Sequence, residues 1–152
     1  AKVLEISDPF AKVEVFEGKE GVKSAMSYIL KDKPKEILVY GSSGVSYKLL
    51  PFFMEHFHRE RTKKKIPLRI IYNNVKESRE RLEEGPSLKL AKVKFFPIKD
   101  VSLTGNIIYN NKILITIWNP ETPLAISIEG KDIAETYRNN FEALWKLAKS
   151  YL

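Results

Sequence analysis

Ile-Leu-Val-Tyr-Gly-Ser-Ser-Gly, residues 37–44, joins a continuous apolar run to a small turn rich in hydroxyl groups. A short run that is apolar at every position predicts a strand buried on both faces of a sheet. A helical pattern opened by Pro51 follows over residues 52–63, and residues 68–72 are a second strand-like run. Strand, helix and strand at this spacing predict a crossover unit with two parallel strands.

The flanking sequence extends this unit into an α/β architecture. Residues 12–17 alternate apolar and charged side chains, as a half-buried strand does, and apolar residues recur with helical spacing over 22–30. Further elements are expected as strands at 91–96, 106–109, 112–118 and 124–128, a charged helix at 76–84 and a long closing helix. We therefore expect a mixed β-sheet with flanking helices, formed by residues 13–152, with residues 1–12 as an N-terminal extension or linker.

The composition limits the class of protein. The chain has 152 residues, 43% of them hydrophobic and 30% charged, which is typical of one globular domain. It has no cysteine, so disulfides are excluded and a cytoplasmic location is favoured. Glutamine is absent while Lys and Glu abound, as in thermophile proteins. No apolar run approaches the ~20 residues of a membrane span, so no membrane partner is expected.

The turn at residues 41–44 is the first candidate ligand site. Its glycines allow close backbone approach, and the next helix begins with unpaired N–H groups, so we include Gly41, Ser42 and Ser43 as candidate ligand contacts. The turn lacks both the Gly-Lys-Ser/Thr of a Walker loop and the G-x-G-x-x-G pattern. Ligand contact and a plain strand-to-helix turn remain equal alternatives.

Two further pairs extend this candidate site. Tyr72 and Asn73 leave the second parallel strand beside the turn, because carboxyl ends of parallel strands meet at one sheet edge. Trp118 and Asn119 end another predicted strand, where an aromatic face beside an amide is typical of sugar binding. The alternative for Trp118 is a place in the core.

The remaining polar clusters favour neither a metal nor a catalytic triad. His56 and His58 are two residues apart on a predicted helix and so cannot share a metal, and we expect no metal and no cofactor. The net charge is +7, with basic residues scattered along the chain; the densest basic tract can bind anions or nucleic acid, but we favour a solvated helix end. The tract consists of Arg59, Arg61, Lys63, Lys64, Lys65 and Arg69.

Three stretches carry a resemblance to a known family. These are the strand, GSSG turn and helix, the hairpin with Asn110-Asn111-Lys112, and the closing helix with Phe141 and Trp145. From about residue 13 onward the chain resembles the C-terminal domain of archaeal TrmB-type transcription regulators, a domain similar in fold to one half of a phospholipase D-like protein. The resemblance implies a homodimer that senses a small polar effector, such as a sugar or a phosphorylated metabolite, with DNA bound through a separate helix-turn-helix domain.

The motifs of catalytic phospholipase D-like proteins are altered here. Their His-x-Lys segment corresponds to residues 106–108, Asn-Ile-Ile, and their Gly-Ser-x-Asn corresponds to residues 116–119, Thr-Ile-Trp-Asn. The loss of the histidine nucleophile and its lysine partner leads us to expect no enzymatic activity. Two alternatives remain: a phosphodiesterase or nuclease that acts as a dimer, and a module that binds nucleic acid directly through the basic tract.

Overall fold

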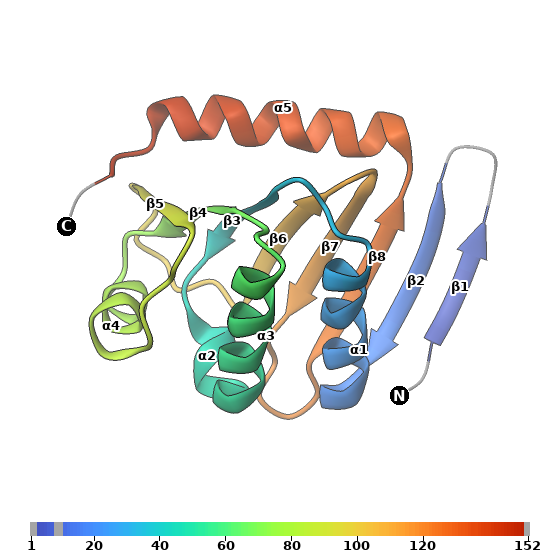
Figure 1. Ribbon diagram of the computed structural model, residues 1–152, viewed down its shortest axis with the longest axis horizontal. Coiled ribbons are helices and arrows are strands. Elements are labelled where there is room, and N and C mark those ends of the chain that lie inside the picture. The colour runs from blue at the N-terminus through green and yellow to red at the C-terminus, as the bar shows by residue number, and fades with distance from the viewer. Residues whose placement is uncertain (1–2, 8–10, 151–152) are drawn as a thin grey trace.

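The strands form one mixed sheet with helices on both faces (Figure 1). The protein is represented by a computed structural model that describes residues 3–7 and 11–150. Within them, the eight strands lie in the order β1-β2-β8-β7-β6-β3-β4-β5, with β3, β4 and β5 parallel and the other neighbours antiparallel. The strands are β1 (Val3–Ser7), β2 (Lys12–Glu17), β3 (Ile37–Ser42), β4 (Leu68–Asn73), β5 (Ala91–Phe96), β6 (Thr104–Tyr109), β7 (Lys112–Ile117) and β8 (Leu124–Glu129).

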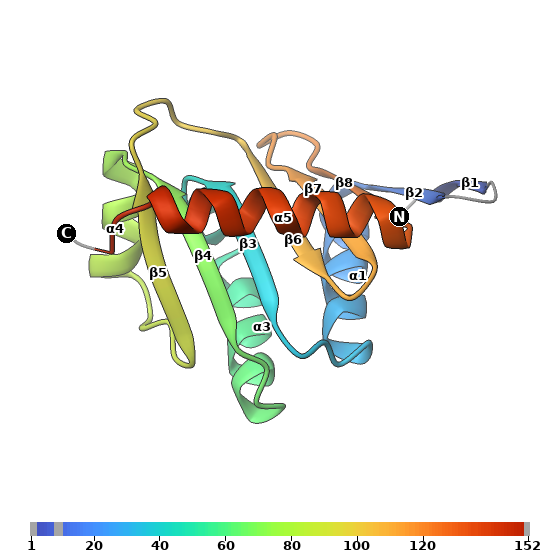
Figure 2. The same ribbon diagram turned by 90° about the horizontal axis from the view of Figure 1, so that it is seen from above.

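The helices make two layers of unequal size. Four helices, α1 (Gly18–Lys31), α2 (Val45–Leu49), α3 (Pro51–Lys63) and α4 (Lys76–Glu84), lie on one face, and α5 (Lys131–Leu147) crosses the other face alone (Figure 2). Each layer covers its own core: the larger lies between the four helices and the sheet, and the smaller lies beneath α5 around Leu38, Ile108 and Phe141. This architecture confirms the predicted α/β class.

The apolar pattern of the sequence explains which face each helix buries. In α1 the residues that recur with helical spacing, such as Val22, Met26 and Ile29, are all buried against the sheet. Pro51 occupies the first turn of α3, where its missing N–H group leaves no hydrogen bond unmade. The five-residue helix α2, which fills the space between the GSSG turn and Pro51, was not predicted.

One arginine fastens α5 to the sheet. Arg69 on β4 donates hydrogen bonds to Glu36, before β3, at 2.7 and 3.1 Å, and to Glu142 on α5 at 2.8 Å from each of two nitrogens. Its guanidinium carbon also lies 5.1 and 5.3 Å from the ring centroids of Phe141 and Trp145. The hydrogen bonds with Glu142 and Glu36 raise the pKa of Arg69 above its ordinary value. Arg69 therefore joins three segments that are distant in sequence.

Two other details differ from the expectation or extend it. The segment expected as an extension or linker contributes β1 to the edge of the sheet, while residues 1–2 and 8–10 lie outside the described residues. The division of the chain at residue 13 stays a prediction. Asn110-Asn111 between two strands predicts a type I′ turn, which needs a positive φ at both residues. In the β6–β7 hairpin Asn110 has a φ of +50°, but Asn111 has no positive φ, so the turn is not type I′. Among the helices described, none has both the length and the apolar character to cross a bilayer.

Candidate ligand-binding cavity

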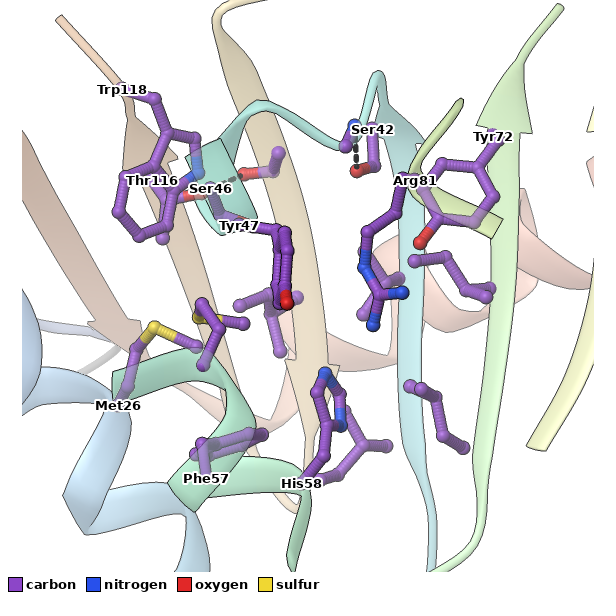
Figure 3. Close-up of a pocket in the computed structure, with 18 of the residues that line it drawn as sticks. Met26, Ser42, Ser46, Tyr47, Phe57, His58, Tyr72, Arg81, Thr116 and Trp118 are labelled. Carbon is purple, nitrogen blue, oxygen red and sulfur yellow. Dashed lines mark hydrogen bonds between the residues drawn. The ribbon is translucent and has the colours of Figure 1, made fainter. Parts of the chain in front are cut away.

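A cavity of about 70 Å³ lies between the larger helical layer and the sheet (Figure 3). Its wall is contributed by α1, the turn after β3, α2, α3, α4 and the strands β3, β4, β6 and β7. Isoleucine, methionine and aromatic side chains form most of the wall, and the polar groups come from Ser42, Ser46, Tyr47, His58, Tyr72, Arg81 and Thr116. A water molecule takes up about 30 Å³ in the liquid, so the space has room for about two water molecules.

The turn after β3 forms the rim of the cavity. Gly41 and Gly44 have φ of +73° and +77°, a left-handed conformation that glycine adopts without strain. Ser42 Oγ accepts a hydrogen bond of 3.3 Å from the Gly44 N–H, which closes the turn before α2 begins at Val45. The glycines thus bring a serine side chain and the start of α2 to the carboxyl end of the central strands.

Arg81 of α4 supplies the buried charge of the site. Its residue is 8% exposed, and its Nη1 donates a hydrogen bond of 2.9 Å to the Pro86 carbonyl. Two glycines make space for it: a Cβ on Gly44 would lie 2.9 Å from Arg81 Cβ, and one on Gly85 would lie 2.6 Å from Arg81 Nη1. The guanidinium carbon is 4.7 Å from the ring centroid of Tyr47 on α2, a cation–π distance.

His58 faces Arg81 across the cavity (Figure 3). Burial lowers the pKa of His58 to about 3, and the positive charges of Arg61 and Arg81 act in the same direction, so the imidazole is neutral at pH 7. Its Nδ1 accepts a hydrogen bond of 3.1 Å from the Nε–H of Arg61. An accepting Nδ1 places the single ring proton on Nε2, so His58 offers a neutral N–H donor.

The opposite end of the cavity is apolar. Met26 of α1, Phe57 of α3 and Trp118 after β7 are all buried there. Thr116 Oγ1 donates a hydrogen bond of 3.4 Å to the Gly105 carbonyl of the neighbouring strand. Tyr72 stands at the polar end, where burial raises the pKa of its hydroxyl to about 12, so the hydroxyl stays protonated. The cavity therefore has an apolar end and a polar, positively charged end.

The structure brings three of the seven proposed ligand contacts together. Ser42, Tyr72 and Trp118 line the cavity, and Gly41 lies next to it in the turn. Three others form hydrogen bonds within the protein. Ser43 is fully buried, with Oγ accepting from the Ser102 N–H; Asn73 Nδ2 donates to the Asp100 carbonyl; and exposed Asn119 accepts from the Glu121 N–H. A ligand role for any of the seven stays a prediction.

Two members of the basic tract are occupied by internal contacts. Arg61 is fully buried and donates to the carbonyls of Ile66, Lys89 and Leu90 at 2.8, 2.6 and 3.1 Å, besides His58. Burial lowers its pKa to about 10, still far above neutral pH. Arg69 forms the cluster beneath α5 described above. Neither side chain is presented to a nucleic acid, so the expected anion-binding surface reduces to Arg59, Lys63, Lys64 and Lys65.

Sequence reasoning missed Arg81, Tyr47 and His58 as members of one site. Arg81 lies in Lys76–Glu84, a stretch so rich in charge that it reads as a solvent-exposed helix. The available signal was the spacing of Val75, Ser78 and Leu82, which marks the inner face of α4 and has Arg81 beside it. In the part of the chain that the structure describes, no three histidine, cysteine or acidic side chains gather closely enough to hold a metal.

Comparison with known proteins gives a structural likeness without a sequence likeness. No protein-family model and no curated protein sequence matches the chain. TrmBL2, an archaeal chromatin protein whose structure shows a novel mode of DNA binding, has a TM-score of 0.65 at 12% identity, over 91% of this chain and 53% of its own. This chain thus spans about half the length of TrmBL2.

Two bacterial structures match over nearly their whole length. NucT from Helicobacter pylori has a TM-score of 0.62 at 12% identity, over 93% of this chain and 99% of its own. Nuc from Salmonella typhimurium, a phospholipase D family member, has a TM-score of 0.61 at 15% identity, over 93% and 98%. At these identities the likeness establishes the fold alone: a phospholipase D-like fold related to that of TrmBL2.

The likeness also corrects one prediction. We expected no enzymatic activity because the histidine and lysine of the phospholipase D-like motif are replaced. That prediction is wrong, because the fold is shared over nearly its full length with Nuc, a phospholipase D family member, and with NucT. Replacement of one motif therefore gives no ground for excluding catalysis by this chain.

Proposed function

We propose that the chain is the effector-sensing and dimerising domain of a TrmB-like transcription regulator, and that its cavity binds a small polar ligand. The premise is the phospholipase D-like fold shared with TrmBL2, about half of whose length this chain spans. The observation that carries the proposal is the cavity itself, which places a buried cation, five hydroxyl-bearing side chains and a neutral imidazole around one space.

The cavity is placed where a ligand can alter the arrangement of elements. Its wall includes the β3 turn and α2, which pack on α4 through Gly44 and Arg81. A ligand that contacts α2, α3 and α4 at once favours one arrangement of these helices over the sheet, which shifts the population of conformations. In a homodimer this shift would change the spacing of DNA-binding domains attached to the two chains.

A ligand screen with a cavity-filling variant tests this function. Thermal unfolding is measured with sugars, phosphorylated metabolites and small organic acids. A true ligand raises the melting temperature of the wild type and loses its effect on Ser46→Phe, which fills the cavity from α2. Ser24→Phe, on the exposed face of α1, is the matched control and retains the effect. A screen without hits, or hits that persist in Ser46→Phe, would contradict the proposal, and sedimentation tests the dimer separately.

Phosphodiester hydrolysis is a second candidate, favoured by the fold shared with Nuc and by the pairing of His58 with Arg81. Arg81 can bind a phosphate, and His58 is the histidine of the cavity. Because Nδ1 of His58 accepts from Arg61, the attacking atom would be Nε2, and its proton must first pass to hydroxide from solvent, since no carboxylate of the described residues lines the cavity. Hydrolysis of bis(p-nitrophenyl) phosphate that disappears in His58→Ala and persists in His56→Ala supports this candidate. If hydrolysis does not exceed the rate in buffer alone, this second candidate function is excluded.

A further inference from the structure

Arg81 brings into the cavity a positive charge that the protein does not neutralise. A guanidinium has five N–H donors, and the hydrogen bond to the Pro86 carbonyl uses one of them. Among the residues described, no carboxylate forms an ion pair with Arg81: Glu80, the acidic residue next to it on α4, pairs instead with Lys48 and Lys76, at 3.6 and 3.5 Å. The Arg81 side chain lines the cavity and two grooves at its outer side.

The packing holds this charge in place. A buried cation without an anionic partner is unfavourable, and side chains of this kind normally leave for solvent or acquire a partner. Here the absence of side chains at Gly44 and Gly85 leaves the space that the Arg81 side chain fills, and the Tyr47 ring lies against it. The planar donor fork is thus fixed and directed at the cavity, which is the geometry that binds a carboxylate or phosphate through two N–H groups.

The charged residues along the grooves that lead to Arg81, and the apolar residues in the cavity wall, indicate the other properties of the ligand. One groove that leads to Arg81, between α3 and the segment before β5, is lined by His58, Arg59 and Lys89 and by a single carboxylate, Glu55. The other groove, between α2 and α4, carries Glu80, Glu84 and Lys48, so an anion enters most favourably by the first. The interior beyond Arg81 is apolar, with Ile29, Phe57 and Ile107 in its wall. Only a small body fits a cavity of about 70 Å³.

We infer that the ligand of the cavity is a small organic anion: an acidic head bound by Arg81 and an apolar body of about three carbons among the isoleucines and aromatic residues. The inference rests on the proposed ligand-sensing function and narrows it. It separates this cavity from a sugar site, because a sugar would leave the charge of Arg81 without an anionic partner and would place hydroxyl groups against the apolar end. Carboxylate and phosphate heads share the chemistry that Arg81 recognises.

A set of ligands with one chain and different heads tests the inference. Binding of butanoate, propyl phosphate and propan-1-ol, which share a propyl chain, to the full chain is measured by calorimetry. The wild type should bind one or both anions at least tenfold more tightly than the alcohol, and the stronger of the two identifies the head. Arg81→Met, which keeps the length and packing of the side chain, should reduce that preference to less than twofold. Arg79→Met removes the same charge from the same helix, outside the cavity, and should leave the preference intact.

The outcomes separate this inference from the proposed function. Equal binding of propan-1-ol and the anions by the wild type would overturn the inference while leaving the cavity as a ligand site. An anion preference that survives in Arg81→Met would overturn it as well. Absence of binding by all three compounds would count against both. If Arg81→Met does not fold, Arg81→Lys serves instead, and it should weaken anion binding because it keeps the charge but loses the fork.

Discussion

At the scale of single residues, two glycines and one arginine determine the character of the cavity. The sequence identifies Gly44 as a turn residue, but it gives no sign that Gly44 and Gly85 pack on the same side chain, because the pair is separated by forty positions. Arg81 is equally hidden, since one arginine among the charges of α4 is ordinary for a solvated helix. Sequence patterns indicate which face of a helix or strand is buried on average. Arg81 is a charged residue that is buried against this average pattern.

A pair of glycine substitutions measures how tightly Arg81 is held. Gly44 and Gly18 both have a φ of +77°, but a Cβ on Gly18 meets nothing within 4 Å while one on Gly44 meets Arg81 at 2.9 Å. Gly18→Ala should therefore lower the free energy of unfolding by only the backbone strain of about 1–2 kcal/mol. Gly44→Ala should lower the free energy of unfolding by about 1–3 kcal/mol more than Gly18→Ala does, because its Cβ overpacks against Arg81. If urea denaturation gives equal losses of unfolding free energy for the two variants, the Arg81 side chain moves aside without an energetic cost.

The neutral state of His58 predicts a dependence of stability on pH. The pKa of His58 is about 3 in the folded protein and about 6.5 when unfolded, so between these values the unfolded chain binds the extra proton. Its contribution to stability is therefore complete above pH 6.5 and is lost as the pH falls toward 3. The slope from this group approaches about 1.4 kcal/mol per pH unit inside that window.

Two histidine variants separate the contribution of His58 to the pH dependence of stability from the contribution of the carboxylates. His58→Asn retains an acceptor for Arg61 but does not titrate, so its free energy of unfolding should fall less steeply between pH 6.5 and 4.5 than that of the wild type. His56→Asn, on the exposed side of α3, should keep the wild-type slope. Parallel curves for wild type and His58→Asn would mean that His58 is protonated in the folded protein.

At the scale of elements, α5 is attached mainly through one arginine and a small apolar core. Sequence periodicity correctly predicted a long amphipathic helix, and its inner residue Phe141 is fully buried. It did not indicate that Arg69, part of the basic tract, lies across the sheet from α3, because the alternation of strand β4 directs Arg69 to the face opposite that helix. The same alternation explains why Arg69 belongs with Glu142 and not with the lysines that precede it.

Removal of Arg69 should loosen α5 more than the rest of the fold. Arg69→Ala deletes the hydrogen bonds to Glu36 and Glu142 and the contacts with two aromatic rings, which should lower the free energy of unfolding by about 1.5–3 kcal/mol. Amide exchange should accelerate in α5 while α1 stays protected. Lys112→Ala, which breaks the Lys112–Asp32 pair, is the control. Uniform acceleration across both helices would contradict the role of Arg69 as a local fastening.

At the scale of the whole molecule, the fold was largely predictable and the site was only partly so. The apolar run at residues 37–40 and the spacing to residues 68–72 specify parallel strands, and β3 and β4 form that pair. The cavity arises between layers, from side chains on four helices and four strands whose relative placement no local pattern encodes. Function was harder to predict than the site, because the altered phospholipase D-like motif suggested that the chain has no catalytic activity, although it shares its fold with Nuc.

The central claim is that a small anion binds between the helical layer and the sheet, with its head at Arg81. The most direct measurement is a titration of the isotope-labelled chain with butanoate, followed by amide chemical shifts. The account predicts saturable shifts concentrated in residues 42–47, at His58 and at Arg81, all around one cavity. Shifts centred instead on Asn73 and Asn119, or on the exposed lysines at 63–65, or no shifts at all, would contradict it.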